Sequence, residues 1–255
     1  MGFHMVRDLD QNEKLGKAIE KAGLNFIPWL NQSAVLKRDT SKGKNWVKDP
    51  PYDCDVLKLE TEIAKYVPAD AEYAYLDIES PMREPFSARS LAVYQDAIGI
   101  AKEVRNRTKW GIYSMVHKPL GWRTPGVSWG HWLNSLHMLT DFSCISVYPR
   151  SGHWTDSLDE RWWNDLRHSD LIINNDMGLQ GFQGRLAFVR PRWASNGGDG
   201  QFVPIEWFRR WIDMLNRDGI AICLFMNKHE QENMLEEFLP YIHMIGELET
   251  TPNET

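Results

Sequence analysis

The chain has 255 residues, 42% of them hydrophobic, which is enough for one large domain or two small ones and argues against extensive disorder. Its net charge of −6 argues against general nucleic-acid binding, which requires a basic surface. No apolar run approaches the roughly 20 residues of a membrane span, and the N-terminus lacks the apolar core of a signal peptide. We therefore expect a soluble protein, and a secreted mature form whose signal has been removed is compatible with this.

Short β-type runs alternate with helical patterns along most of the chain. The expected strands are residues 2–6, 25–30, 73–79, 110–116, 142–148, 171–174, 186–190 and 220–226. The expected helices are residues 10–22, 57–66, 88–107, 129–139, 158–167, 204–217 and 230–242. The helix from residue 88 has the apolar spacing of an amphipathic helix that covers a sheet.

The chain length of about 250 residues and the alternation of up to eight strands with helices are typical of a (β/α)8-type TIM barrel. An open doubly wound sheet is the alternative, but no glycine-rich phosphate loop follows any strand. We expect a single barrel over residues 1–249, followed by a loose tail at residues 250–255. The barrel is expected to be irregular or to have fewer strands, because residues 175–184 are too few for a full helix.

Polar and aromatic residues gather where the expected strands end, which is where the active site of such a barrel lies. These residues are Trp29, Asn31, Asp77, Glu79, His117, Tyr148, Arg150, Asp176, Arg190, Trp193 and Asn227. Tryptophans near these ends either pack in the core or offer flat stacking surfaces to sugar rings. On the regular elements, Trp110, Trp207 and Trp211 are expected in the core.

The stretch EYAYLDIESP raises the question of why two carboxylates, Asp77 and Glu79, follow a buried strand at a spacing that puts them on one face. Neighbouring carboxylates move each other's pKa values apart, which provides the acid and the base that glycosidic cleavage needs. The alternatives are ion pairs with nearby arginines and a Mg²⁺ site that also uses Asp176.

The motifs of common metal sites are missing from the sequence. It contains no HxH or HExxH pattern, and its three cysteines lack metal-ligand spacing. Cys144 and Cys223 are expected to be buried free thiols. A hydrolase of this kind needs no metal and no cofactor.

Four short motifs occur in a fixed order between roughly residues 72 and 227. They are D-x-E followed by R and P from Asp77 to Pro85, W-G-x-Y from Trp110 to Tyr113, W-L running to S-x-Y from Trp132 to Tyr148, and R-P-x-aromatic from Arg190 to Trp193. In these motifs the chain resembles the hyaluronidase family of glycoside hydrolases, whose fold is an irregular (β/α) barrel. The family's disulfides and its late W-G pair are absent, and its first-strand W-N-x-P pattern is reduced to Trp29-Leu30-Asn31.

The resemblance implies endo-cleavage of a hyaluronan- or chondroitin-like glycan by substrate-assisted, retaining hydrolysis. Glu79 would be the general acid/base, Asp77 would orient the substrate's 2-acetamido group, and Tyr148 would hydrogen-bond that group. Tyr113 joins the other strand-end residues as an expected substrate-binding residue. Three alternatives stay open: a muramidase- or chitinase-like glycosidase, a non-catalytic carbohydrate-binding barrel, and a metal-dependent lyase or isomerase.

Overall fold

The computed structural model describes residues 2–5, 13–38, 52–78, 88–114, 123–124, 127–128, 138–146, 185–192, 201–217, 221–226, 230 and 233–250. The chain divides into two compact units. Unit 1 comprises Met1–Ile27, Ile145–Asp165 and Gly184–Thr255, and unit 2 comprises Pro28–Cys144 and Leu166–Gln183. Within the described ranges, no helix is long and apolar enough to cross a membrane.

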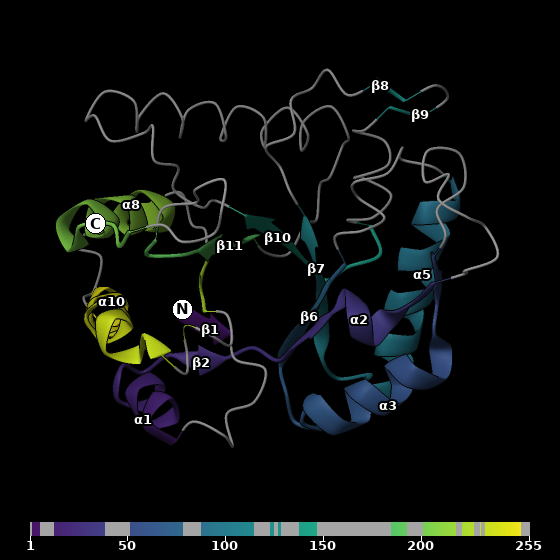
Figure 1. Ribbon diagram of the computed structural model, residues 1–255, viewed down its shortest axis with the longest axis horizontal. Helices are drawn as coiled ribbons and strands as arrows, with labels where there is room; N and C mark the ends of the chain where they lie inside the picture. Colours follow the sequence, from purple (N-terminus) through teal and green to yellow (C-terminus); the bar gives the residue numbers. More distant parts are fainter. Residues whose placement is uncertain are drawn as a thin grey trace. The chain divides into compact units, whose positions relative to one another are not determined.

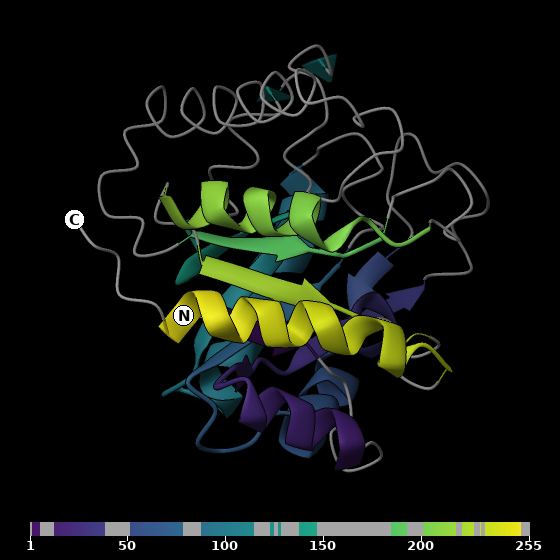
Figure 2. The same ribbon diagram turned by 90° about the vertical axis from the view of Figure 1, so that its left-hand side faces the viewer.

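In the described part of unit 1 the strands lie in the order β2-β1-β12-β11, and neighbouring strands pair in parallel. The strands are β1 (Gly2–Met5), β2 (Asn25–Phe26), β11 (Arg185–Val189) and β12 (Ala221–Phe225). Its helices are α1 (Glu13–Lys21), α8 (Ile205–Arg217) and α10 (Leu235–Thr250). Helix α8 packs against β12 and α10 against β1, and both helices are prominent in Figure 2.

The helices of unit 1 are held by large apolar side chains and by one close backbone contact. Trp207 and Trp211 of α8 are buried, as the sequence predicted. Helix α10 lies so close to the end of α1 that a Cβ atom added at Gly246 would clash with the carbonyl oxygen of Ala22. Glycine at position 246 therefore permits the packing of α10 against α1.

In the described part of unit 2 the strands lie in the order β3-β6-β7-β10, with parallel pairing between β3 and β6 and between β6 and β7, and the last two residues of β10 belong to unit 1. Figure 1 labels β6, β7 and β10. These strands are β3 (Trp29–Asn31), β6 (Tyr73–Asp77), β7 (Lys109–Ser114) and β10 (Phe142–Ser146). The helices are α2 (Gln32–Val35), α3 (Val56–Tyr66) and α5 (Ala88–Val104). Two small antiparallel ladders join β4 (Leu36–Arg38) to β5 (Tyr52–Cys54) and β8 (Arg123–Thr124) to β9 (Val127–Ser128).

Helices α3 and α5 pack against each other in unit 2 and bury apolar stripes. Asp55 caps α3 by accepting a hydrogen bond from the backbone N–H of Lys58 (3.3 Å), which satisfies one donor of the first turn. The stripe on α5 has the predicted amphipathic spacing, and its fully buried members are Tyr94, Ala97 and Ala101. Trp110 of β7 is also fully buried, as the sequence predicted.

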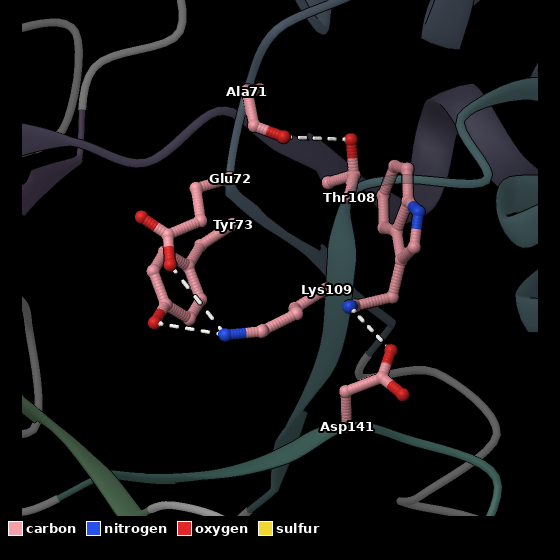
Figure 3. Close-up of polar contacts among 7 residues, drawn as sticks. Ala71, Glu72, Tyr73, Thr108, Lys109 and Asp141 are labelled. Atoms are coloured by element: carbon pink, nitrogen blue, oxygen red, sulfur yellow. Dashed lines mark hydrogen bonds and ion pairs between the residues drawn. The ribbon is translucent and has the colours of Figure 1, made fainter.

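The amino ends of β6, β7 and β10 carry a network of polar contacts (Figure 3). Lys109 Nζ lies 3.5 Å from Glu72 Oε1, and the Thr108 hydroxyl donates to the carbonyl oxygen of Ala71 (2.8 Å). Asp141 accepts a hydrogen bond from the backbone N–H of Trp110 (2.8 Å). Asp141 also forms an ion pair with Lys102 of α5 (3.0 Å). These contacts join neighbouring strands to one another and to the helix layer.

The predicted α/β class is confirmed, and most expected elements of the described ranges are present within a few residues of their expected ends. A closed barrel is not detected among the described residues, so barrel closure stays a prediction. The expected strand at residues 171–174 and helix at residues 158–167 lie outside the described residues, as does nearly all of the helix expected at residues 129–139.

One expected strand, residues 25–30, is divided in two. Its first part, β2, pairs with β1 and its second part, β3, pairs with β6. Between them lies Pro28, which has no N–H to donate to a ladder but accepts a hydrogen bond from the N–H of Tyr75 (3.1 Å). A second difference is α10, which begins at Leu235 and continues to Thr250, beyond the expected end at residue 242.

Candidate active site

The carboxyl ends of β3 and β6 bring several predicted site residues together within unit 2. The parallel register places Trp29 opposite Tyr75 and Asn31 opposite Asp77. Alternation along a strand puts Tyr75 and Asp77 on one face. The rings of Trp29 and Tyr75 are stacked, with centroids 6.2 Å apart and planes inclined by 12°. Asn31 and Asp77, predicted separately from the sequence, are therefore neighbours at the same level of adjacent strands.

The two faces of this strand pair differ in chemistry. Leu30, Leu76 and Ile78 form the opposite face and are fully buried in the apolar core. Asp77 is half-buried, and its Oδ1 atom is shielded from solvent. The strand end therefore combines a shielded carboxylate with a neighbouring amide and an aromatic pair, an arrangement suited to holding a polar group of a ligand through hydrogen bonds.

Tyr113 lies in β7, directly after Ile112, which pairs with Leu76 of β6. Its backbone thus belongs to the strand next to β6, and the description does not extend to its side chain. Seven other predicted site residues lie outside the described residues and stay predictions. They are Glu79, His117, Tyr148, Arg150, Asp176, Trp193 and Asn227.

Arg190 follows β11 in unit 1 and belongs to a buried ion cluster that the sequence did not reveal. The carboxylate of Glu230 is fully buried. Its Oε1 accepts hydrogen bonds from Arg190 Nε (3.0 Å) and Nη2 and from Arg192 Nη1 (2.7 Å). We call these three residues the Arg–Glu–Arg cluster. With two cations and one anion it has a net positive charge next to the carboxyl ends of β11 and β12.

Aromatic packing fixes the Arg–Glu–Arg cluster from one side. The guanidinium of Arg192 lies over the ring of Phe202, 5.7 Å from its centroid. Phe202 contacts the rings of Phe238 and Tyr241 in α10, and the hydroxyl of Tyr241 donates to the carbonyl oxygen of Val203. The arginines are thus held by charge and by packing, which restricts their side-chain freedom.

No local sequence signal links Glu230 to its partners, because they lie about 40 residues earlier in the chain. Position 230 was expected only to begin a helix. A buried glutamate between arginines becomes recognisable once β11 and β12 are known to be neighbours. The sequence does not show which distant strands pair, and the contact of Glu230 with the two arginines could not be predicted without that information.

The thiol of Cys54 is not a reactive thiolate. Burial raises the pKa of the Cys54 thiol to about 12, and the negative charges of Asp96 and Asp55 contribute to the same shift. The thiol is therefore protonated at neutral pH and is a poor nucleophile. Cys223 is buried and not part of a disulfide, as expected. Among the described residues, no three His, Cys, Asp or Glu side chains are grouped to hold a metal ion.

No protein-family model and no curated protein matches this chain. Among solved structures, it is similar to bee venom hyaluronidase in a monoclinic crystal form, with a TM-score of 0.67 at 11% identity over 96% of this chain and 99% of the other. It is also similar to bee venom hyaluronidase in complex with a hyaluronic acid tetramer, with a TM-score of 0.63 at 12% identity over 94% and 96% of the two chains. The chain therefore shares the fold of a glycoside hydrolase over almost its whole length.

Proposed function

We propose that this protein is a glycoside hydrolase that cleaves a polysaccharide at the linkages of a 2-acetamido sugar. The observation that carries the proposal is the fold similarity to a hyaluronidase over 96% of the chain. That hyaluronidase also forms a complex with a hyaluronic acid tetramer, a polymer that contains a 2-acetamido sugar. The proposal includes a (β/α) barrel over residues 1–249 and a substrate cleft at the carboxyl ends of its strands.

The proposed mechanism assigns separate roles to the two carboxyl groups of the D-x-E motif. Glu79 donates a proton to the glycosidic oxygen as the bond to the anomeric carbon breaks. Asp77 accepts a hydrogen bond from the N–H of the 2-acetamido group, whose carbonyl oxygen attacks the anomeric carbon and forms a cyclic oxazolinium ion. Tyr148 hydrogen-bonds the same group. This is a substrate-assisted variant of retaining hydrolysis.

The second step restores the enzyme. Glu79, now ionised, removes a proton from a water molecule that attacks the anomeric carbon and reopens the ring. Two inversions at one carbon give a product with retained configuration. No enzyme nucleophile is needed, which fits a D-x-E motif whose two carboxyl groups are proposed to approach the sugar from one side.

The described geometry of Asp77 supports this role. Its half-buried position beside Asn31 limits competition from water, and a hydrogen bond to a carboxylate is strengthened where solvent is excluded. Trp29, stacked on Tyr75, is suited to contact the apolar face of a sugar ring. We assign substrate binding to Trp29, Asn31, Tyr113, His117, Arg150, Asp176, Arg190, Trp193 and Asn227.

The test is digestion of hyaluronan, chondroitin, chitin oligosaccharides and peptidoglycan, with new reducing ends measured and the products identified by mass spectrometry. NMR of the first product should show retained anomeric configuration. A thiazoline mimic of the cyclic intermediate should inhibit, and Asp77→Asn should abolish turnover without trapping a covalent adduct. Activity should persist in EDTA.

Each rival predicts a different result in the same assay. An inverted product would contradict substrate assistance and would make Asp176 the leading candidate for a base acting through water. Binding of a glycan without any new reducing ends would instead support a non-catalytic carbohydrate-binding protein. Loss of activity in EDTA would support the metal-dependent alternative.

A further inference from the structure

A buried hydrogen bond from α5 holds the backbone directly after β6. The hydroxyl of Tyr94 donates to the carbonyl oxygen of Ile78 at 2.5 Å. Both residues are fully buried, and both belong to unit 2. Strand β6 ends at Asp77, so Ile78 is the first residue beyond the strand. A buried carbonyl oxygen at this point requires a hydrogen-bond donor, and Tyr94 provides one.

The position of this hydrogen bond in the chain suggests that it affects the proposed active site as well as stability. Ile78 separates the two carboxyl residues of the D-x-E motif, with Asp77 before it and Glu79 after it. A peptide unit is planar and rigid, so a hydrogen bond that holds the carbonyl oxygen of Ile78 also restricts the orientation of the peptide plane that joins Ile78 to residue 79. The hydroxyl of Tyr94 therefore acts on the backbone between the two proposed catalytic groups.

The tyrosine is itself held in place. Helix α5 buries Ala97, Ile98 and Ala101 in the same stripe as Tyr94, and the helix packs against β7 beside β6. Small side chains at positions 97 and 101 allow close approach of the helix to the sheet. The phenol therefore extends from a rigid element, and its hydroxyl is a fixed donor.

We propose that Tyr94 is a positioning residue that sets the relative orientation of Asp77 and Glu79. The inference rests on the proposed glycosidase function and adds to it a residue that touches neither substrate nor reacting atoms. Catalytic groups must be held within a fraction of an ångström of the productive geometry, since a misplacement of about 1 Å can lower the rate about 100-fold.

The experiment compares Tyr94→Phe with a matched control, Tyr241→Phe. In both wild-type sites a buried tyrosine hydroxyl donates to a buried backbone carbonyl, that of Ile78 in one case and that of Val203 in the other. Each variant removes one such hydrogen bond, so the two melting temperatures should fall by similar amounts. Only the first variant changes the backbone next to the proposed catalytic pair.

We expect Tyr94→Phe to lower kcat on hyaluronan, or on the glycan that wild type cleaves best, by about 10- to 100-fold. KM should change by less than about 2-fold, because substrate contacts are unchanged. Tyr241→Phe should retain wild-type kcat. Hydrogen exchange in the peptide covering residues 73–80 should be faster in Tyr94→Phe than in wild type and unchanged in Tyr241→Phe.

The outcomes separate this inference from the proposal on which it rests. Equal kcat values for the two variants, with wild type active, would overturn the positioning role and leave the glycosidase function standing. A wild type that releases no reducing ends from any glycan would overturn the function and the positioning role together. Unchanged hydrogen exchange in Tyr94→Phe would contradict the claimed restraint on the backbone even if kcat fell.

Discussion

The two ends of the strands in unit 2 use polar side chains differently. At the amino ends, Thr108 and Asp141 bond to backbone groups of neighbouring segments, and Asp141 also pairs with Lys102. At the carboxyl ends, the register sets Asp77 beside Asn31 on a face that also carries two stacked rings. The first set joins strands and helix to one another, whereas the second gathers polar and aromatic groups on one face.

This difference leads to opposite expectations for substitutions. Changes at the carboxyl ends should lower turnover more than stability, because the groups proposed there act on the substrate. Changes at the amino ends should lower stability and leave turnover unchanged. Such a separation is typical of (β/α) barrels, in which chemistry is confined to one end of the strands.

Glu79→Gln should have the largest effect on turnover and tests the comparison most directly. Loss of a general acid typically costs 10²- to 10⁴-fold, so we expect kcat to fall by at least about 10²-fold. The melting temperature should be nearly unchanged, since the amide has the same shape as the carboxylic acid. The matched control is Glu72→Gln, the same change at the exposed amino end of β6. Retention of more than about a tenth of wild-type kcat would remove Glu79 from the catalytic role.

Glu230→Gln is expected to be an exception to this difference between the strand ends. Glu230 lies beyond the carboxyl end of β12, but its contacts stabilise the fold. The change leaves the charges of Arg190 and Arg192 without their buried counter-charge. Removing one partner of a buried ion pair typically costs about 3–5 kcal/mol, and we expect a loss of that size in urea unfolding. The exposed pair of Glu247 with Arg209 provides the control, Glu247→Gln, with a loss below about 1 kcal/mol. Equal losses in the two variants would show that burial of Glu230 adds nothing.

Asp141→Ala should have the smallest effect of these three substitutions. It tests the expectation that residues at the amino ends of the strands affect stability and not turnover. It removes the acceptor for the N–H of Trp110 and the ion pair with Lys102. An orphaned backbone donor costs about 1–3 kcal/mol, which we expect to measure in urea unfolding with kcat unchanged. A clear fall in kcat would show that the two ends are coupled.

Lys109→Met is the matched control for Asp141→Ala, because it breaks an exposed contact at the same strand ends. Its hydrogen bond to Tyr73 and its pairing with Glu72 raise the pKa of Lys109. A raised pKa means that the contribution to stability is complete below the ordinary value of 10.5 and is lost as the pH rises through the folded-state pKa. Any small difference between this variant and wild type should therefore disappear at strongly alkaline pH.

Regular elements with clear periodicity were predictable from the sequence. Helix α5 and strand β6 follow directly from their apolar spacing, and the buried positions of Trp207 and Trp211 follow from the pattern of α8. Short elements such as α2 and β4, with four and three residues, contain too few positions for a period to be visible. The break at Pro28 could have been predicted, because a proline lacks the N–H that a continuous central strand needs.

The candidate site was predictable only in part. Polar residues directly after apolar runs identified Asp77 and Asn31, and the structure adds that the two are paired in register. The contacts of Tyr94 with Ile78 and of Glu230 with Arg190 join segments 16 and 40 residues apart. Such contacts depend on the order of the strands and on the packing of each helix against them. Local periodicity in the sequence predicts neither the strand order nor this packing.

The parallel pairing of β1 with β12 has a consequence for synthesis of the chain on the ribosome. Gly2 pairs with Ile222, about 220 residues later, so the edge of β1 that pairs with β12 has no partner until β12 has been translated. At roughly 5–20 residues per second this interval is about 10–45 s. Segment Pro28–Cys144 of unit 2 emerges well before that and contains β3, β6 and β7, which pair with one another. Throughout that interval the nascent chain carries an open strand edge, the kind of surface that molecular chaperones protect from aggregation.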